Sequence, residues 1–285
     1  MSEHEKTLTE YIRDLSSEDA DIRIRAAIEL GEWGHDRAVT PLIKILSHPD
    51  ENLRRAAARA LKEIENKRSV KPLMFTLLND DSAEVRAESA YALAYFTNVK
   101  FDTTDLITAL QDGHYLVRQN AAFALGRLRS RKGVRHLISV LENDDNYNVR
   151  EMAAYALGEI KDKRATNALL KALDDSRLTV RKNAAYALGK LQVPTTVDLL
   201  KKHLLKEGEA KESAWALSRI LRKRDSINAL KDGYKKLRKE KYIEDCIEVC
   251  RILNDLDRKI AKKYLEEMLE DENFSSYFDD IKSIS

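Results

Sequence analysis

The chain has 285 residues, with 50 Lys and Arg against 48 Asp and Glu, so its formal net charge is only +2. This balance does not imply bulk attraction to nucleic acid. The 9 Gly and 4 Pro leave little room for flexible linkers, which favours one continuous domain over residues 1–285. No signal segment opens the chain and no run approaches the ~20 apolar residues of a membrane span, so we expect a cytoplasmic protein without membrane contact.

The first predicted element is a helix over residues 5–16. It carries Leu8, Tyr11, Ile12 and Leu15 on one face and charged residues elsewhere. A helix with one apolar face at the start of a repeat array is typical of a terminal cap. We therefore assign residues 1–18 to an N-terminal capping helix.

A repeated segment follows, and it is clearest from Asp112 to Leu128, D-G-H-Y-L-V-R-Q-N-A-A-F-A-L-G-R-L. Its Val-Arg step recurs at intervals of 31, 32, 32, 32 and 31 residues, and a blurred copy starts at Glu209. The apolar positions of each copy fall within an arc of about 100°, as on the buried face of an amphipathic helix. The steps are Ile22-Arg23, Leu53-Arg54, Val85-Arg86, Val117-Arg118, Val149-Arg150 and Val180-Arg181.

A second, shorter apolar pattern lies between successive copies, for example at residues 38–46 and 165–173. Each repeat is therefore a short helix A, a turn and a longer helix B. Such a hairpin cannot bury its apolar face alone, but stacked hairpins share one core. The sequence predicts an all-α solenoid of eight to nine hairpins, with regular repeats over 19–223 and degenerate repeats plus a C-terminal cap over 224–285.

The motif D-x-x-x-x-V-R-x-x-A-A-x-A-L-G-x-L resembles the HEAT repeat in its short variety, the PBS-lyase HEAT-like repeat, over roughly residues 5–223. That family contains lyases, hydroxylases, glycosylase relatives and many interaction scaffolds, so the resemblance implies a fold and leaves the function open. It also implies that one side of helix B lines a concave surface.

The Arg of each Val-Arg step recurs with an Asp five residues before the Val, as in Asp112 and Arg118. A row of arginines could form a track for phosphate groups. A repeated acid and base, however, most simply tie one repeat to the next, and the resemblance implies the same use. We expect the structural role.

On the predicted concave side, one position of helix B is aromatic in five successive copies, and we call these residues the aromatic stripe: Tyr91, Phe123, Tyr155, Tyr186 and Trp215. Aromatic side chains are favoured anchors of protein interfaces, although the rings could instead lie flat on their neighbours and thicken the core. With their polar neighbours they form our predicted partner-binding set: Tyr91, Tyr95, Gln119, Asn120, Phe123, Arg127, Met152, Tyr155, Glu159, Lys182, Asn183, Tyr186, Lys190, Trp215 and Arg219.

Catalysis is not required by any motif. Deoxyhypusine hydroxylases, which resemble this chain in repeat type, carry iron-binding His-Glu pairs just after the Val-Arg step, where this chain has Gln119-Asn120 and Glu151-Met152. Bilin lyases share the repeat, but no residue here is diagnostic of them.

The two cysteines, Cys246 and Cys250, lie one helical turn apart and could be a redox pair or half of a metal site, but we interpret them as core residues.

Charge is uneven near the C-terminal end. Residues 201–241 contain 14 Lys and Arg against 6 Asp and Glu, and residues 242–285 contain 6 against 12. The basic segment could bind phosphate, an acidic partner or the acidic tail, or it could be a solvated helix face.

We predict a monomeric, non-catalytic scaffold without cofactor or metal that binds another protein in its groove. The alternatives are nucleic-acid binding through residues 201–241 and, less favoured, a bilin-lyase-like enzyme.

Overall fold

The computed structural model describes residues 7–284, and over this range the chain is helical throughout, without a β-strand. The predicted all-α solenoid of stacked hairpins is confirmed. The chain divides into two compact units, residues 1–140 and 141–285, which are described separately. Residues 1–6 of the predicted N-terminal cap lie outside the described residues, and the single-domain assignment stays a prediction.

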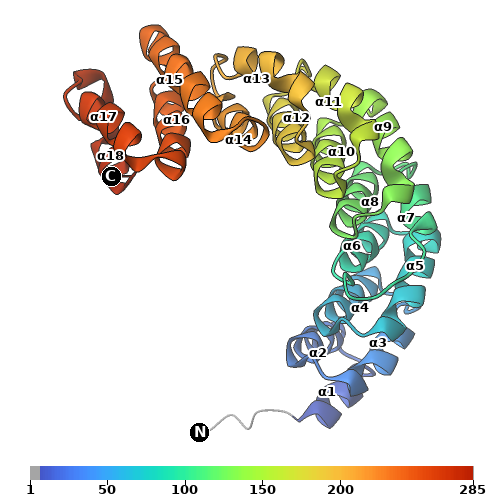
Figure 1. Ribbon diagram of the computed structural model, residues 1–285. Helices are drawn as coiled ribbons and strands as arrows, with labels where there is room; N and C mark the ends of the chain where they lie inside the picture. Colours follow the sequence, from blue (N-terminus) through green and yellow to red (C-terminus); the bar gives the residue numbers. More distant parts are fainter. Residues whose placement is uncertain (1–6, 285) are drawn as a thin grey trace, which may run out of the picture. The chain divides into compact units, whose positions relative to one another are not determined.

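Unit 1 contains two rows of helices (Figure 1). The B helices are long and pack on one another in sequence order, and each A helix packs on the B helix that follows it. The B helices are α2 (Ala20–Trp33), α4 (Glu51–Ile64), α6 (Ala83–Leu93) and α8 (Tyr115–Arg127). The A helices are α1 (Leu8–Asp14), α3 (Val39–Ile45), α5 (Val70–Asn79) and α7 (Thr104–Ala109), and the boundary between the units falls within α9 (Val134–Asn143).

Unit 2 repeats the arrangement, and its longest helix is α15, with 18 residues (Figure 1). Successive B helices again pack directly on one another. They are α10 (Tyr147–Ile160), α12 (Leu178–Leu191), α14 (Ala210–Ile220) and α16 (Ile243–Leu256), and the other helices are α11 (Thr166–Ala172), α13 (Val197–His203), α15 (Lys223–Glu240), α17 (Arg258–Leu269) and α18 (Phe278–Ile284).

The B helices approach closely because the motif places small residues on their shared faces. Gly158 of α10 is the clearest case, since a Cβ atom added there would lie 2.9 Å from both the Cα and the Cβ of Ala187 in α12. Ala153, Ala154, Ala184 and their equivalents in the other copies are also buried. The alanine- and glycine-rich motif is therefore the packing surface between neighbouring repeats.

An arginine ladder ties neighbouring repeats within each unit, as predicted, but each arginine pairs with the acid of the following copy and not with the Asp of its own copy. Arg86 binds both carboxylate oxygens of Asp112, at 2.8 and 3.0 Å, and its third nitrogen donates to the carbonyl oxygen of Asp80 at 2.8 Å. The carboxylate thus comes from the following repeat, and the arginine's own repeat supplies a backbone acceptor. The same bidentate pairing occurs at Arg54 with Asp80 and Arg150 with Asp175, and Arg181 binds one carboxylate oxygen of Glu209.

This ladder is structural because its charges are satisfied within the fold. The side chains of Arg86 and Asp112 are only 18% and 13% exposed. Burial alone would raise the pKa of the Asp112 carboxyl, but the hydrogen bonds from Arg86 and the N–H of His114 hold it below its ordinary value. Guanidinium groups committed to bidentate pairs of this kind do not offer a track for phosphate.

Candidate functional site

Three residues of the aromatic stripe stack on one another in unit 2. The rings of Tyr155 and Tyr186 have centroids 6.2 Å apart at an interplanar angle of 10°, and those of Tyr186 and Trp215 are 4.9 Å apart at 21°. They lie on α10, α12 and α14 respectively, and each side chain is half-buried. Each ring thus packs against its neighbour and keeps part of its surface in solvent, so the rings are neither fully exposed nor part of the closed core.

Polar contacts hold the middle ring of this stack in place. The Tyr186 hydroxyl donates to Glu159 Oε1 at 3.1 Å, and Lys190 Nζ lies 3.0 Å from the same oxygen and 5.3 Å from the Tyr186 ring centroid. The contacts with Tyr186 and Glu159 raise the pKa of the Lys190 ammonium. A fixed ring beside an ordered charged pair loses little conformational entropy when a partner binds.

In unit 1 the stripe has a second, separate stack. Tyr91 of α6 and Phe123 of α8 lie 5.6 Å apart at 17°, and the Tyr91 hydroxyl is 2.6 Å from that of Tyr95. The Nζ of Lys62 lies 5.2 and 5.1 Å from the centroids of the two tyrosine rings, and the Arg127 guanidinium carbon is 5.4 Å from Tyr95. The hydrogen bond with Tyr91 and burial raise the pKa of Tyr95. This cluster is an aromatic surface flanked by two cations.

The other predicted site residues either bind backbone groups of their own unit or lie partly exposed on the same helices. Asn120 and Asn183 bind backbone within their own units, because their Nδ2 atoms donate to Ala87 O at 2.8 Å and Thr179 O at 3.1 Å. The remaining residues lie along the same helices with part of their surface in solvent. Gln119, Met152 and Lys182 are half-buried, and Arg127 and Arg219 are exposed.

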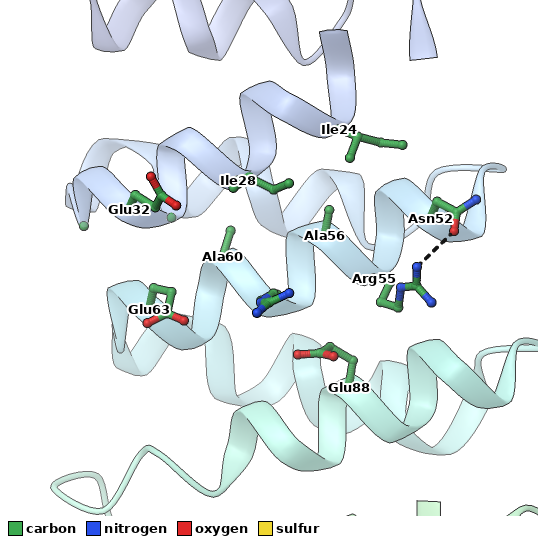
Figure 2. Close-up of a pocket in the computed structure, with 12 residues that line it drawn as sticks. Ile24, Ile28, Glu32, Asn52, Arg55, Ala56, Ala60, Glu63 and Glu88 are labelled. Atoms are coloured by element: carbon green, nitrogen blue, oxygen red, sulfur yellow. Dashed lines mark hydrogen bonds between the residues drawn. The ribbon is translucent and has the colours of Figure 1, made fainter. Parts of the chain in front are cut away.

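A pocket at the start of the B-helix row was not predicted from the sequence. It has a volume of about 680 Å³ and lies between α2, α4 and α6 (Figure 2). We call it the N-terminal pocket, and its walls include Ile24, Ile28, Arg55, Arg59 and Glu88. Burial raises the pKa of the Glu88 carboxyl although three cationic side chains lie nearby. The pocket therefore offers apolar, basic and acidic groups together.

The repeat register contains the signal that locates this pocket. Counted from the Ile22-Arg23 step, Ile28 occupies the stripe position of the first copy, and Arg59 occupies it in the second. Ile28 is 44% exposed. The stripe position therefore continues into the first two repeats with an aliphatic and a cationic side chain, so a search for aromatic residues alone does not find it.

A buried polar cluster in unit 2 was also missed. His203 is fully buried, and its Nδ1 lies 2.6 Å from Oε2 of Glu209, whose Oε1 binds Arg181 at 2.7 Å. The six histidines share no ligand spacing, so no pattern in the sequence selects this one. The cluster lies at the turn between α13 and α14, where Glu209 is the acid that pairs with the last arginine of the ladder.

The cysteines are core residues, as interpreted from the sequence. Cys246 and Cys250 are unpaired, and both are fully buried on α16. Burial raises the pKa of the Cys246 thiol to about 12 and that of Cys250 further. Among the described residues, no group of three or more His, Cys, Asp or Glu side chains is arranged to hold a metal ion.

The sequence profile of HEAT repeats matches residues 6–94, 103–177 and 134–218, together more than half of the chain. The chain belongs to the HEAT-repeat family. No curated protein matches it in sequence. None of the helices described over residues 7–284 is long and apolar enough to cross a membrane.

Solved structures with a similar fold have little sequence identity to this chain. The complex of CpcE and CpcF of phycocyanin lyase from Nostoc sp. PCC7120 is 22% identical with a TM-score of 0.51, covering 90% of this chain and 97% of that one. Escherichia coli YibA is 22% identical with a TM-score of 0.63, covering 89% and 93%. The Kap95:Nup1 complex is 12% identical with a TM-score of 0.71, covering 96% and 46%. At these identities the likeness shows the fold alone.

Proposed function

We propose that this HEAT-repeat protein is a non-catalytic scaffold or adaptor that binds another protein along its B-helix surface. The observation that carries the proposal is the stack of Tyr155, Tyr186 and Trp215, half-exposed on three consecutive B helices. Large rings held in fixed positions with a polar rim are the composition of interface hot spots. Two of the similar solved structures are themselves complexes of proteins, CpcE with CpcF and Kap95 with Nup1.

The polar rim supports selectivity for one partner. Glu159 and Lys190 pair beside Tyr186, and Lys182, Met152 and Arg219 follow the same surface. Mixed charges around an apolar centre favour a partner with the complementary pattern and disfavour others. We therefore expect a specific partner for the unit 2 surface.

The test is a triple variant, Tyr155→Ser, Tyr186→Ser and Trp215→Ser, used beside the wild type in affinity purification from native extract treated with nuclease. A stoichiometric protein partner should be retained by the wild type and lost with the variant. The matched control is Tyr147→Ser, because Tyr147 also lies on α10 and is half-buried, but its ring packs under Arg177 at 4.1 Å and away from the stack.

Thermal unfolding of the same proteins separates binding from folding. Trp215 lies against Gly189, where an added Cβ would meet the indole ring at 2.7 Å, so the triple variant should lose some stability. It should still unfold cooperatively above the temperature of the binding assay. Retention of the partner by a folded triple variant would disprove the role of the stack, and partners lost on nuclease treatment of the wild type would favour nucleic-acid binding.

A further inference from the structure

A groove between α15 and α17 in unit 2 is lined mainly by lysine side chains. It has a volume of about 430 Å³, and its walls carry five cationic side chains against one acid, Glu267. We call it the lysine groove, defined by Lys231, Lys235, Lys239 and Lys263, with Arg238, Tyr234 and Tyr264 at its base. The chain as a whole has a net charge of only +2, so this imbalance is local.

The register of α15 produces the lysine groove. Lys231, Lys235 and Lys239 follow one another at every fourth position, which places them on one face of the helix about 6 Å apart along its axis. Like charges at this spacing repel and destabilise a helix. Among the ion pairs of the described residues, none joins these three lysines to an acid, and Lys263 has only a 4.0 Å contact with Glu267.

Two acids, Glu267 and Asp271, pair with the arginine at the base of the groove. Arg238 lies 3.1 Å from Glu267 and 3.0 Å from Asp271, so the one guanidinium contacts both carboxylates and offsets one of their two negative charges. Its planar donor fork is thereby occupied, and the groups left to meet a ligand are lysine ammoniums. Ammonium groups act as compact point charges that suit phosphate oxygens.

The aromatic rings of the groove are closed to a ligand. Tyr234 and Tyr264 are 1% and 5% exposed, and their rings pack on each other at 4.6 Å. Single-stranded nucleic acids gain much of their affinity by stacking bases on exposed rings, which this groove does not offer. Its volume is within the range of small-ligand sites.

From this arrangement we propose that the lysine groove binds a small oligophosphate anion through its lysine side chains. The site is separate from the aromatic stripe and independent of the proposed scaffold function. Recognition is of clustered phosphate charge, so binding weakens as salt screens it.

Calorimetric titration of the full chain with inorganic tripolyphosphate tests the proposal. Lys235→Gln with Lys239→Gln should weaken binding about 10- to 30-fold at low salt, because two ammonium contacts are lost. The control, Lys171→Gln with Lys202→Gln, removes the same charge from two exposed lysines on α11 and α13 and should bind as the wild type does. All four lysines are exposed, so both variants should fold.

Two further ligands test whether the groove prefers a small oligophosphate to a nucleic acid or to an acidic peptide. A single-stranded oligonucleotide with three phosphates should bind no more tightly than tripolyphosphate, and a short poly-glutamate peptide should bind more weakly. Absence of tripolyphosphate binding, an equal loss in the control variant, or clearly tighter binding of the oligonucleotide or the peptide would overturn the proposal.

Discussion

Substitution of one ladder arginine should measure how much the ladder stabilises the fold. Arg150 of α10 binds Asp175 at 2.8 and 3.0 Å and donates to the carbonyl oxygens of Asp144 and Asp145 at 2.9 and 3.2 Å. Arg150→Met keeps much of the aliphatic packing but leaves Asp175 without its guanidinium. The side chains of the pair are 15% and 12% exposed, so the loss should approach that of a buried pair.

The expected cost lies between two limits. Breaking a fully buried ion pair costs about 3–5 kcal/mol, and an exposed pair contributes about 0–1 kcal/mol. For a pair that retains slight solvent contact we expect about 2–3 kcal/mol. At roughly 2–4 °C per kcal/mol, the melting temperature should fall by about 4–12 °C. Arg150→Lys keeps the charge but loses the bidentate geometry, so it should give an intermediate loss.

Urea unfolding followed by circular dichroism provides the assay. The matched control is Lys171→Met, which removes a cation from another inter-repeat pair of unit 2, Lys171 with Glu142 at 3.0 Å. These side chains are 74% and 33% exposed, so the control should lose less than about 1 kcal/mol. Equal losses in Arg150→Met and Lys171→Met would refute the reasoning that the ladder is a principal tie between repeats.

Three further outcomes follow from the same geometry. Gly158→Val should destabilise unit 2 by about 1–3 kcal/mol in urea unfolding, whereas an unchanged midpoint would show that the helices can separate without cost. Burial alone would raise the pKa of Asp175, but Arg150 holds it below its ordinary value. The stability that this pair contributes should therefore be complete above about pH 4 and be lost as the pH falls through the lowered pKa. The difference between the urea midpoints at pH 7 and pH 3 should be smaller in Arg150→Met than in the wild type. Cys246 and Cys250 should react with a thiol reagent at pH 8 only after denaturation, and rapid labelling of the native protein would contradict their burial.

The period of the sequence was enough to predict the solenoid, the alternation of A and B helices and the arginine ladder. These features depend on short-range spacing, which repeats every 31 or 32 residues. The carboxylate partner of each arginine could not be chosen from spacing alone, because the pair joins residues about 26 positions apart. The half-burial of Tyr186 could not be predicted either, since it depends on the distance between neighbouring helices.

The lysine groove shows a second limit of sequence reasoning. The lysines of α15 are visible as a basic run, but the groove requires α17 as its other wall. No repeat motif relates these two helices, because the regular pattern has faded after Leu221. Their side-by-side placement follows from packing of both on α16, which only the folded chain reveals.

The need for an acid opposite each ladder arginine persists in the copy where the repeat motif has become degenerate. Arg181 is a partly buried guanidinium that needs a carboxylate from the next repeat, yet the turn that follows α13 is longer and has no Asp at the usual distance. Glu209 supplies the charge from 28 residues away, and its longer side chain also reaches His203. Asp245 then accepts hydrogen bonds from the N–H groups of Gly208 and Ala210 at 2.7 and 3.3 Å, which secures the start of α14 from α16. The degenerate copy therefore keeps the tie between repeats through different residues, which is why the helical stack continues where the motif is no longer recognisable.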